Sequence, residues 1–280
     1  MSGTTRNATS PIGIFDSGVG GLTVVRAVAD ALPSERLVYL GDTARVPYGS
    51  KSADTVLRYS VLSTRFLLSH DVKMILVACN TASAFAMSEL AALLPVPVLG
   101  AIEPGARAAL AATKTGRIGV LGTLGTVRSA AYPRALARLA AEAGGLPIEI
   151  TAKACPLLVP LAEEGWLDDP VAEAVARRYL GELHAEAPSL DVLVLGCTHY
   201  PLLRQVLTRV AAEIWSHPVT LVDSAGAMAA RARLELERLE LLHPTATGTL
   251  QTFVTDDARI EEIGTRFLGR PLGTVTRVDL

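Results

Sequence analysis

Two cysteines stand where parallel strands are expected to end, and one of them has a histidine close by. Cys197 follows the apolar run 192–196 and lies two residues before His199. Cys79 follows a similar run at 72–78. Ligands of open α/β sheets bind beyond the carboxyl ends of the strands, and a helix N-terminus at such a place lowers the pKa of a thiol towards the thiolate. Both thiols are therefore candidates for proton transfer or nucleophilic attack.

A packing role is the competing interpretation for the two thiols, and a surface or capping role is the alternative for His199. A free cysteine on an apolar strand is more often a small buried hydrophobe, and we interpret Cys155 in this way because it has no polar neighbours in sequence. The equivalent positions of Cys79 and Cys197 favour chemistry. Glu163 and Glu164 end a predicted helix, where the helix dipole disfavours carboxylates. A position at the protein surface explains at least one of these two glutamates.

A glycine-rich turn at 16–21 follows the predicted strand 12–15. It is not a dinucleotide fingerprint, because residue 23 is threonine, and no Gly-Lys-Ser/Thr phosphate loop occurs in the chain. The turn can instead offer backbone N–H groups and a helix N-terminus to an anion such as a carboxylate. A tight turn in which Asp16 caps the helix is the alternative.

The loop that follows the second predicted strand contains three further candidates. These are Asp42, Tyr48 and Gly49, which are expected to face the same cleft. A turn role for Asp42 and a rim position for Tyr48 are the structural alternatives.

Strands alternate with helices along the chain, which is typical of parallel sheets covered on both faces. We predict strands at 12–15, 37–40, 72–78, 96–99, 118–122, 148–153, 192–196, 219–222 and 250–254. Helices are expected at 22–32, 53–69, 80–93, 105–113, 157–163, 170–185, 201–215 and 225–241. The runs at 12–16 and 118–122 are alike, so we predict two similar α/β domains with the active site between them. Residues 1–102 with 210–280 form one domain, and 103–209 form the other.

Composition excludes several classes of protein. Half of the 280 residues are hydrophobic and the formal charge is −2, so nothing indicates a nucleic-acid or membrane partner. No window approaches the ~20 apolar residues of a membrane span, and the polar residues 1–10 lack a signal region. Three widely spaced cysteines indicate neither a disulfide framework nor a metal site. We expect a soluble, cytoplasmic protein.

Seven runs in order along the chain resemble the glutamate racemase family. They are 12–24, 41–45, 47–49, 78–82, 103–106, 196–201 and 222–224. Together these runs are highly specific, although each alone is weak. Val46 departs from the pattern, since relatives often have cysteine or an aromatic residue there, and the loop around it is expected to differ in shape.

The resemblance implies a racemase that interconverts L- and D-glutamate without a cofactor, supplies D-glutamate for peptidoglycan, and forms a homodimer. It implies that Cys79 and Cys197 are the acid/base residues on opposite faces of the substrate, with Asp16 beside the first and Glu163 and His199 serving the second. The implied substrate contacts are Asp16, Ser17, Tyr48, Gly49, Asn80, Thr81, Thr198 and His199.

Other functions remain as alternatives. A pyridoxal-phosphate racemase needs a Schiff-base lysine, and no lysine of this chain (51, 73, 114, 153) has a recognisable context. A sister racemase acting on aspartate or hydantoins is the nearest rival, and a sister decarboxylase needs only one of the two cysteines. A two-lobed amino-acid-binding protein would not need paired thiols, and a thiol redox protein would need a Cys-x-x-Cys motif, which is absent.

Overall fold

The computed structural model describes residues 7–145, 147–245 and 247–280. Residues 1–6 of the predicted N-terminal tail lie outside these ranges.

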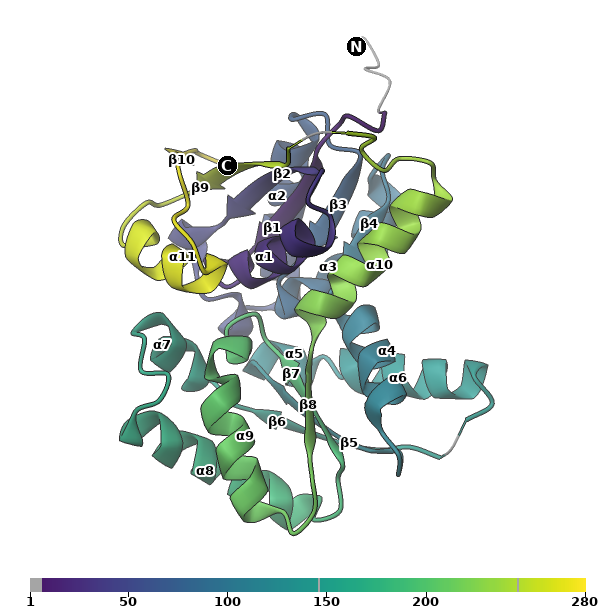
Figure 1. The fold of residues 1–280 in the computed structure, drawn as a ribbon, viewed down its shortest axis with the longest axis vertical. Coiled ribbons are helices and arrows are strands. Elements are labelled where there is room, and N and C mark those ends of the chain that lie inside the picture. The colour runs from purple at the N-terminus through teal and green to yellow at the C-terminus, as the bar shows by residue number, and fades with distance from the viewer. Residues whose placement is uncertain (1–6, 146, 246) are drawn as a thin grey trace.

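Two parallel sheets form the framework of the molecule (Figure 1). In spatial order the larger sheet contains β10 (Val275–Arg277), β9 (Thr249–Val254), β2 (Arg36–Gly41), β1 (Ile12–Asp16), β3 (Met74–Val77) and β4 (Val98–Gly100). The smaller sheet contains β6 (Glu149–Ala154), β5 (Arg117–Gly122), β7 (Val192–Gly196) and β8 (Thr220–Asp223). All strand pairs are parallel. The predicted fold class is therefore confirmed.

Helices cover both faces of the larger sheet because alternate strand residues are buried on each side. One face packs against α1 (Leu22–Ala31), α10 (Ser224–Arg238) and α11 (Ile260–Leu268), and the other against α2 (Ala53–Leu68) and α3 (Asn80–Leu93). On β1, Ile12 and Ile14 belong to the first cluster and Phe15 to the second. This alternation is the period of two expected for a strand.

The smaller sheet is covered in the same way. Its first face packs against α4 (Ile102–Ala112) and α6 (Ala131–Glu142), and its second against α7 (Leu158–Glu163), α8 (Pro170–Glu186) and α9 (Arg204–Ile214). Short helices follow three strands: α5 (Leu124–Arg128), and the 3-10 helices η2 (Tyr48–Ser50) and η3 (Tyr200–Leu203). One hydrophobic cluster continues from the larger sheet into the smaller one, so the two lobes share buried contacts.

The chain returns to the first lobe later than the predicted boundary at residue 209. Strand β8 pairs with β7 in the smaller sheet, and α9 packs against α8. The chain rejoins the larger sheet from α10 onwards, since α10 packs on α1 and is followed by β9 and β10 of that sheet. We therefore propose domains at 1–102 with 224–280 and at 103–223. The helix predicted at 105–113 also begins earlier, at Ile102, with Pro104 in its first turn.

Within the described residues, the helices are too short or too polar to cross a lipid bilayer.

Candidate active site

A cavity of about 220 Å³ lies between the lobes, at the carboxyl ends of β1, β3 and β7. Both predicted thiols, Cys79 and Cys197, line it. Its other lining residues are Ser17, Gly18, Val46, Pro47, Tyr48, Gly49, Ser50, Asn80, Thr81, Thr123, Pro156, Val159, Pro160, Glu163, Thr198 and His199. The structure thus brings together the two cysteines and most of the predicted substrate contacts, with one thiol from each lobe.

Cys79 occupies the N-cap position of α3. Its sulfur accepts a hydrogen bond from the Ala82 backbone N–H at 3.4 Å and donates one to Ser17 Oγ at 3.2 Å. Burial, followed by the negative charge of Asp16, raises the pKa of Cys79 to about 12. The lowered pKa expected from the helix N-terminus is therefore wrong for Cys79, because burial outweighs the hydrogen bonds that the thiol makes with Ser17 and Ala82. At neutral pH this thiol keeps its proton.

Asp16 ends β1 behind the cavity and is fully buried. Its Oδ2 accepts a hydrogen bond from the Gly18 backbone N–H at 3.1 Å. Burial raises the pKa of this carboxyl, and the charge of His199 opposes that rise. Asp16 is not among the residues that line the cavity, and its charge acts on the Cys79 thiol.

The second thiol belongs to a chain of three polar side chains. Cys197 Sγ lies 3.8 Å from His199 Nδ1, and His199 Nε2 lies 2.8 Å from Glu163 Oε1. Burial disfavours the charged imidazole, but the hydrogen bonds with Cys197 and Glu163 outweigh it and raise the pKa of His199 to about 10. His199 therefore links the Cys197 sulfur to the Glu163 carboxylate. The two sulfurs are in different environments, because Cys197 lies beside an imidazole and Cys79 contacts a hydroxyl and the backbone of α3.

Replacing Glu163 with glutamine tests this chain through its pH dependence. Because the pKa of His199 is higher in the folded protein than its usual value of 6.5, the protonated imidazole stabilises the fold. This stabilisation is complete below pH 6.5 and is lost as the pH rises through about 10. We expect Glu163→Gln to lower the His199 pKa and to flatten the decline of the melting temperature between pH 6.5 and about 10. Imidazole NMR and calorimetry measure the two effects. Glu164→Gln is the control, because Glu164 forms an exposed ion pair with Arg259; an unchanged titration in Glu163→Gln would contradict the assignment.

Asn80 presents an amide whose donor side is free for a ligand. Its Oδ1 accepts a hydrogen bond from the Tyr132 hydroxyl at 2.9 Å. Its Nδ2 is buried and has no hydrogen-bond partner among the described residues. A buried amide without a partner costs free energy, so a carboxylate oxygen in the cavity is a natural acceptor for it. The hydroxyl of Thr81, next in sequence, lies 2.9 Å from that of Thr123 in the other lobe.

The loop after β2 contributes the rim of the cavity. The Tyr48 hydroxyl donates to the buried carboxylate of Asp42, and Tyr48 lines the cavity. Asp42 lies behind Tyr48 and outside the cavity lining. A Cβ on Gly49 would lie 2.7 Å from Thr123 Cβ, so only glycine allows this close approach of the two lobes. The exposed Val46, the departure from the family pattern, also lines the cavity.

Sequence reasoning missed three kinds of residue at this site. Thr123, the N-cap of α5, follows β5 as Cys79 follows β3. Its position directly after a predicted strand could have identified it as a site residue. Pro156, Val159 and Pro160 form an apolar wall, for which the sequence carries no chemical signal. Tyr132 reaches Asn80 from the other lobe, a contact that only the tertiary structure creates.

Two further residues, Cys155 and Glu164, lie outside the cavity lining. Cys155 is fully buried, and its sulfur lies 3.6 Å from the Lys153 carbonyl oxygen rather than in the cavity. Glu164 forms its ion pair with Arg259 at the surface.

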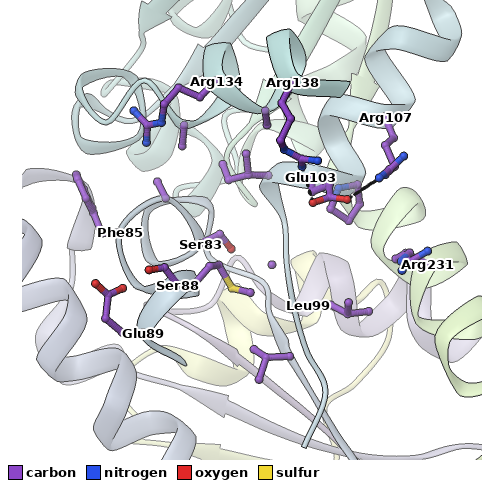
Figure 2. Close-up of a pocket in the computed structure, with 18 residues that line it drawn as sticks. Ser83, Phe85, Ser88, Glu89, Leu99, Glu103, Arg107, Arg134, Arg138 and Arg231 are labelled. Atoms are coloured by element: carbon purple, nitrogen blue, oxygen red, sulfur yellow. Dashed lines mark hydrogen bonds and ion pairs between the residues drawn. The ribbon is translucent and has the colours of Figure 1, made fainter. Parts of the chain in front are cut away.

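A larger cavity of about 790 Å³ is lined by residues of α3, β4, α4, α6 and α10 (Figure 2). Figure 2 shows Glu103 between two arginines, Arg107 at 2.7 Å and Arg138 at 2.9 Å. Neither cysteine nor histidine is among the residues that line it. Of the run 103–106, Glu103 and Pro104 line this second cavity, whereas both candidate thiols line the smaller one.

Comparison with known proteins agrees with this geometry. The model of the Asp/Glu/Hydantoin racemase family matches residues 22–232. The chain is 51% identical to the glutamate racemase of Geobacter metallireducens, with 96% of each chain covered. It is 50% identical to that of Syntrophus aciditrophicus, over 96% of this chain and 97% of the relative.

Solved structures give the same result. The Thermus thermophilus glutamate racemase, in complex with β-chloro-D-alanine, is 45% identical and superposes with a TM-score of 0.85 over 98% of this chain and 99% of that one. The Francisella tularensis enzyme, in complex with D-glutamate, is 31% identical, with a TM-score of 0.87 over 97% and 98% of the two chains. This chain belongs to the Asp/Glu/Hydantoin racemase family.

Proposed function

We propose that this protein is a glutamate racemase that inverts Cα by cofactor-independent proton transfer between two cysteines. The observation that carries the proposal is the pair of thiols, Cys79 and Cys197, which reach one cavity from opposite lobes. Identity of 50–51% to the two glutamate racemases over nearly the whole chain supports glutamate as the substrate.

The two thiols have complementary tasks in each turnover. Cys197, as a thiolate beside His199, removes the Cα proton of L-glutamate, and the thiol of Cys79 delivers its own proton to the opposite face. The products are D-glutamate, a protonated Cys197 and a deprotonated Cys79, so charge and protons balance. In the reverse direction the roles exchange, and solvent protons restore the starting form between turnovers.

The negative charge that develops at Cα and on the α-carboxylate needs donors already in place. Asn80 Nδ2, without a partner among the described residues, and the hydroxyls of Ser17 and Thr81 provide them. The N-terminus of α3 adds the favourable end of a helix dipole. These groups stabilise the carbanion in place of a cofactor.

Replacing Tyr132 with phenylalanine tests the role of Asn80. The variant loses the hydrogen bond that orients the amide but keeps the buried ring. A hydrogen bond of about 1 kcal/mol corresponds to a rise in KM of roughly fivefold, and we expect kcat to change less. Initial rates at varied L-glutamate measure both constants. An unchanged KM would show that Tyr132 does not position this substrate contact.

Circular dichroism and proton NMR of L-glutamate in deuterated buffer test the proposed activity. We expect loss of optical activity together with exchange of the Cα proton, under reducing conditions and without added cofactor. L- and D-aspartate and a hydantoin, treated in the same way, test the sister racemases. If L-glutamate keeps both its optical activity and its Cα proton, the proposal is refuted. Faster turnover of aspartate would instead identify the protein as an aspartate racemase.

The biological setting rests on the family resemblance. We propose that the protein acts in the cytoplasm as a homodimer and supplies D-glutamate for peptidoglycan. Sedimentation equilibrium measures the oligomeric state directly, and a monomer at working concentration would contradict the dimer.

A further inference from the structure

The C-terminal helix α11 contacts the Cys197 side of the active site although it lies beyond residue 232, where the family match ends. Figure 1 shows α11, in yellow, at the edge of the upper lobe and above α7 of the lower lobe. Gly264 allows α11 to pack closely on α1, since a Cβ there would lie 3.1 Å from Leu22 Cδ1. The helix is therefore fixed to the first lobe while its side chains reach the second.

Arg266 of α11 binds the backbone of the residue that orients His199. Its Nη1 donates a hydrogen bond to the carbonyl oxygen of Glu163, the last residue of α7. The last carbonyls of a helix lack partners within the helix, and a cation there is favourable. The guanidinium also lies against Gly165, where a Cβ would be 2.8 Å from Arg266 Cζ. Arg266 thus fixes the end of α7 from which the Glu163 carboxylate extends towards His199.

Phe267, the next residue, contacts the imidazole itself. The two rings meet edge to face, with centroids 4.9 Å apart and an interplanar angle of 73°. Phe267 is fully buried, so its ring is held firmly. Two successive residues of α11 therefore hold both partners of the Glu163–His199 pair, one by its backbone and one by its ring.

We propose that Arg266 and Phe267 are positioning residues for the Cys197–His199–Glu163 chain. Through them, α11 affects the rate of proton transfer by Cys197 but not the rate of proton transfer by Cys79. The proposal rests on the proposed racemase function and extends it to a segment outside the recognised motifs. The surroundings of Cys79 come from Ser17 and Ala82 of its own lobe. Disturbing α11 should therefore slow the Cys197 step and leave the Cys79 step largely intact.

A second contact between the same two elements provides a matched control. Arg259, which precedes α11, forms an ion pair with Glu164 at 2.8 Å, and both side chains are about half exposed. If α11 served only to hold the lobes together, losing either arginine would have a similar effect. Under the proposal, only Arg266 and Phe267 affect the chemistry.

The experiment compares Arg266→Ala, Arg266→Lys, Phe267→Leu and Arg259→Ala in the full-length protein, each checked by thermal unfolding. Racemisation has an equilibrium constant of one, so kcat/KM must be equal in both directions, and primary isotope effects are needed to separate the two steps. Rates are measured with L- and D-glutamate carrying protium or deuterium at Cα. A slower Cys197 step raises the isotope effect on kcat/KM for the L enantiomer and lowers it for the D enantiomer.

We expect Arg266→Ala and Phe267→Leu to lower kcat by about 10- to 100-fold, the scale of small misplacements in active sites, with this asymmetry. Arg266→Lys should recover part of the loss, and Arg259→Ala should behave as the wild type. Equal isotope effects for both enantiomers, or the same loss in Arg259→Ala, would overturn the proposal. If Arg266→Ala does not fold, the results for Arg266→Lys and Phe267→Leu decide whether the proposal holds. An inactive wild type would refute the racemase function instead.

Discussion

Replacing either Cys79 or Cys197 with serine is expected to abolish net racemisation. A positioned acid or base contributes about 10²- to 10⁴-fold to a rate, and a serine hydroxyl at neutral pH neither accepts the Cα proton nor donates one as readily as a thiol. Because each thiol works on its own face of Cα, one cannot replace the other. We therefore expect kcat to fall by at least about 100-fold in each single variant, measured by circular dichroism with both enantiomers.

Cys155→Ser is the matched control for this experiment. Cys155 is fully buried but outside the cavity, and its sulfur already lies near the Lys153 carbonyl, which a hydroxyl can also use as acceptor. Activity should stay largely intact. A similar loss in all three variants would show that the effect comes from the fold, and the assignment of Cys79 and Cys197 would fail.

The second large effect is expected from Gly20→Ala in the glycine-rich turn. A Cβ at this position would lie 2.2 Å from Thr198 Oγ1 and 2.5 Å from His199 Nδ1, distances that real Cβ atoms do not show. Both side chains must move away, and the contact of the imidazole with Cys197 is disturbed. Misplacing a catalytic group by about 1 Å costs on the order of 100-fold in rate, and we expect a loss of kcat of that size.

Gly181→Ala controls for the change of glycine to alanine. Gly181 lies within α8, and a Cβ there would meet no atom within 4 Å. Alanine in a helix interior is favoured by about 1 kcal/mol, so this variant should keep full activity and melt slightly higher. Unfolding curves and steady-state rates measure both variants. Full activity in Gly20→Ala would show that the imidazole tolerates displacement and that its contact with Cys197 is unimportant.

The residues at strand ends were predictable because their positions follow from a local pattern. Cys79 and Cys197 each follow a buried apolar run, and parallel strands bring their carboxyl ends to one edge of a sheet. The choice of sheet for a short strand is not local. Strand β8 has four residues, and the pattern of 220–223 does not reveal that its partner is β7 rather than a strand of the larger sheet.

Electrostatics were the least predictable property of the site. The position of Cys79 at a helix N-terminus indicates a lowered pKa, yet the sulfur is buried next to Asp16, and the pKa rises to about 12. The burial of Cys79 depends on packing among first-lobe segments that are distant along the chain. For the same reason the sequence did not reveal that Tyr132 or Arg266, distant along the chain, would contact Asn80 and Glu163.

The most direct test of the two-thiol mechanism is the fate of the Cα hydrogen during the first turnovers. The enzyme is equilibrated in deuterated buffer and mixed with L-glutamate, and both enantiomers are analysed at low conversion. The mechanism predicts that the D-glutamate formed carries deuterium at Cα, because Cys79 delivers a solvent-derived hydrogen, while the remaining L-glutamate retains protium. D-glutamate that retains the original protium would mean that a single group carries the hydrogen between faces, and would contradict the mechanism.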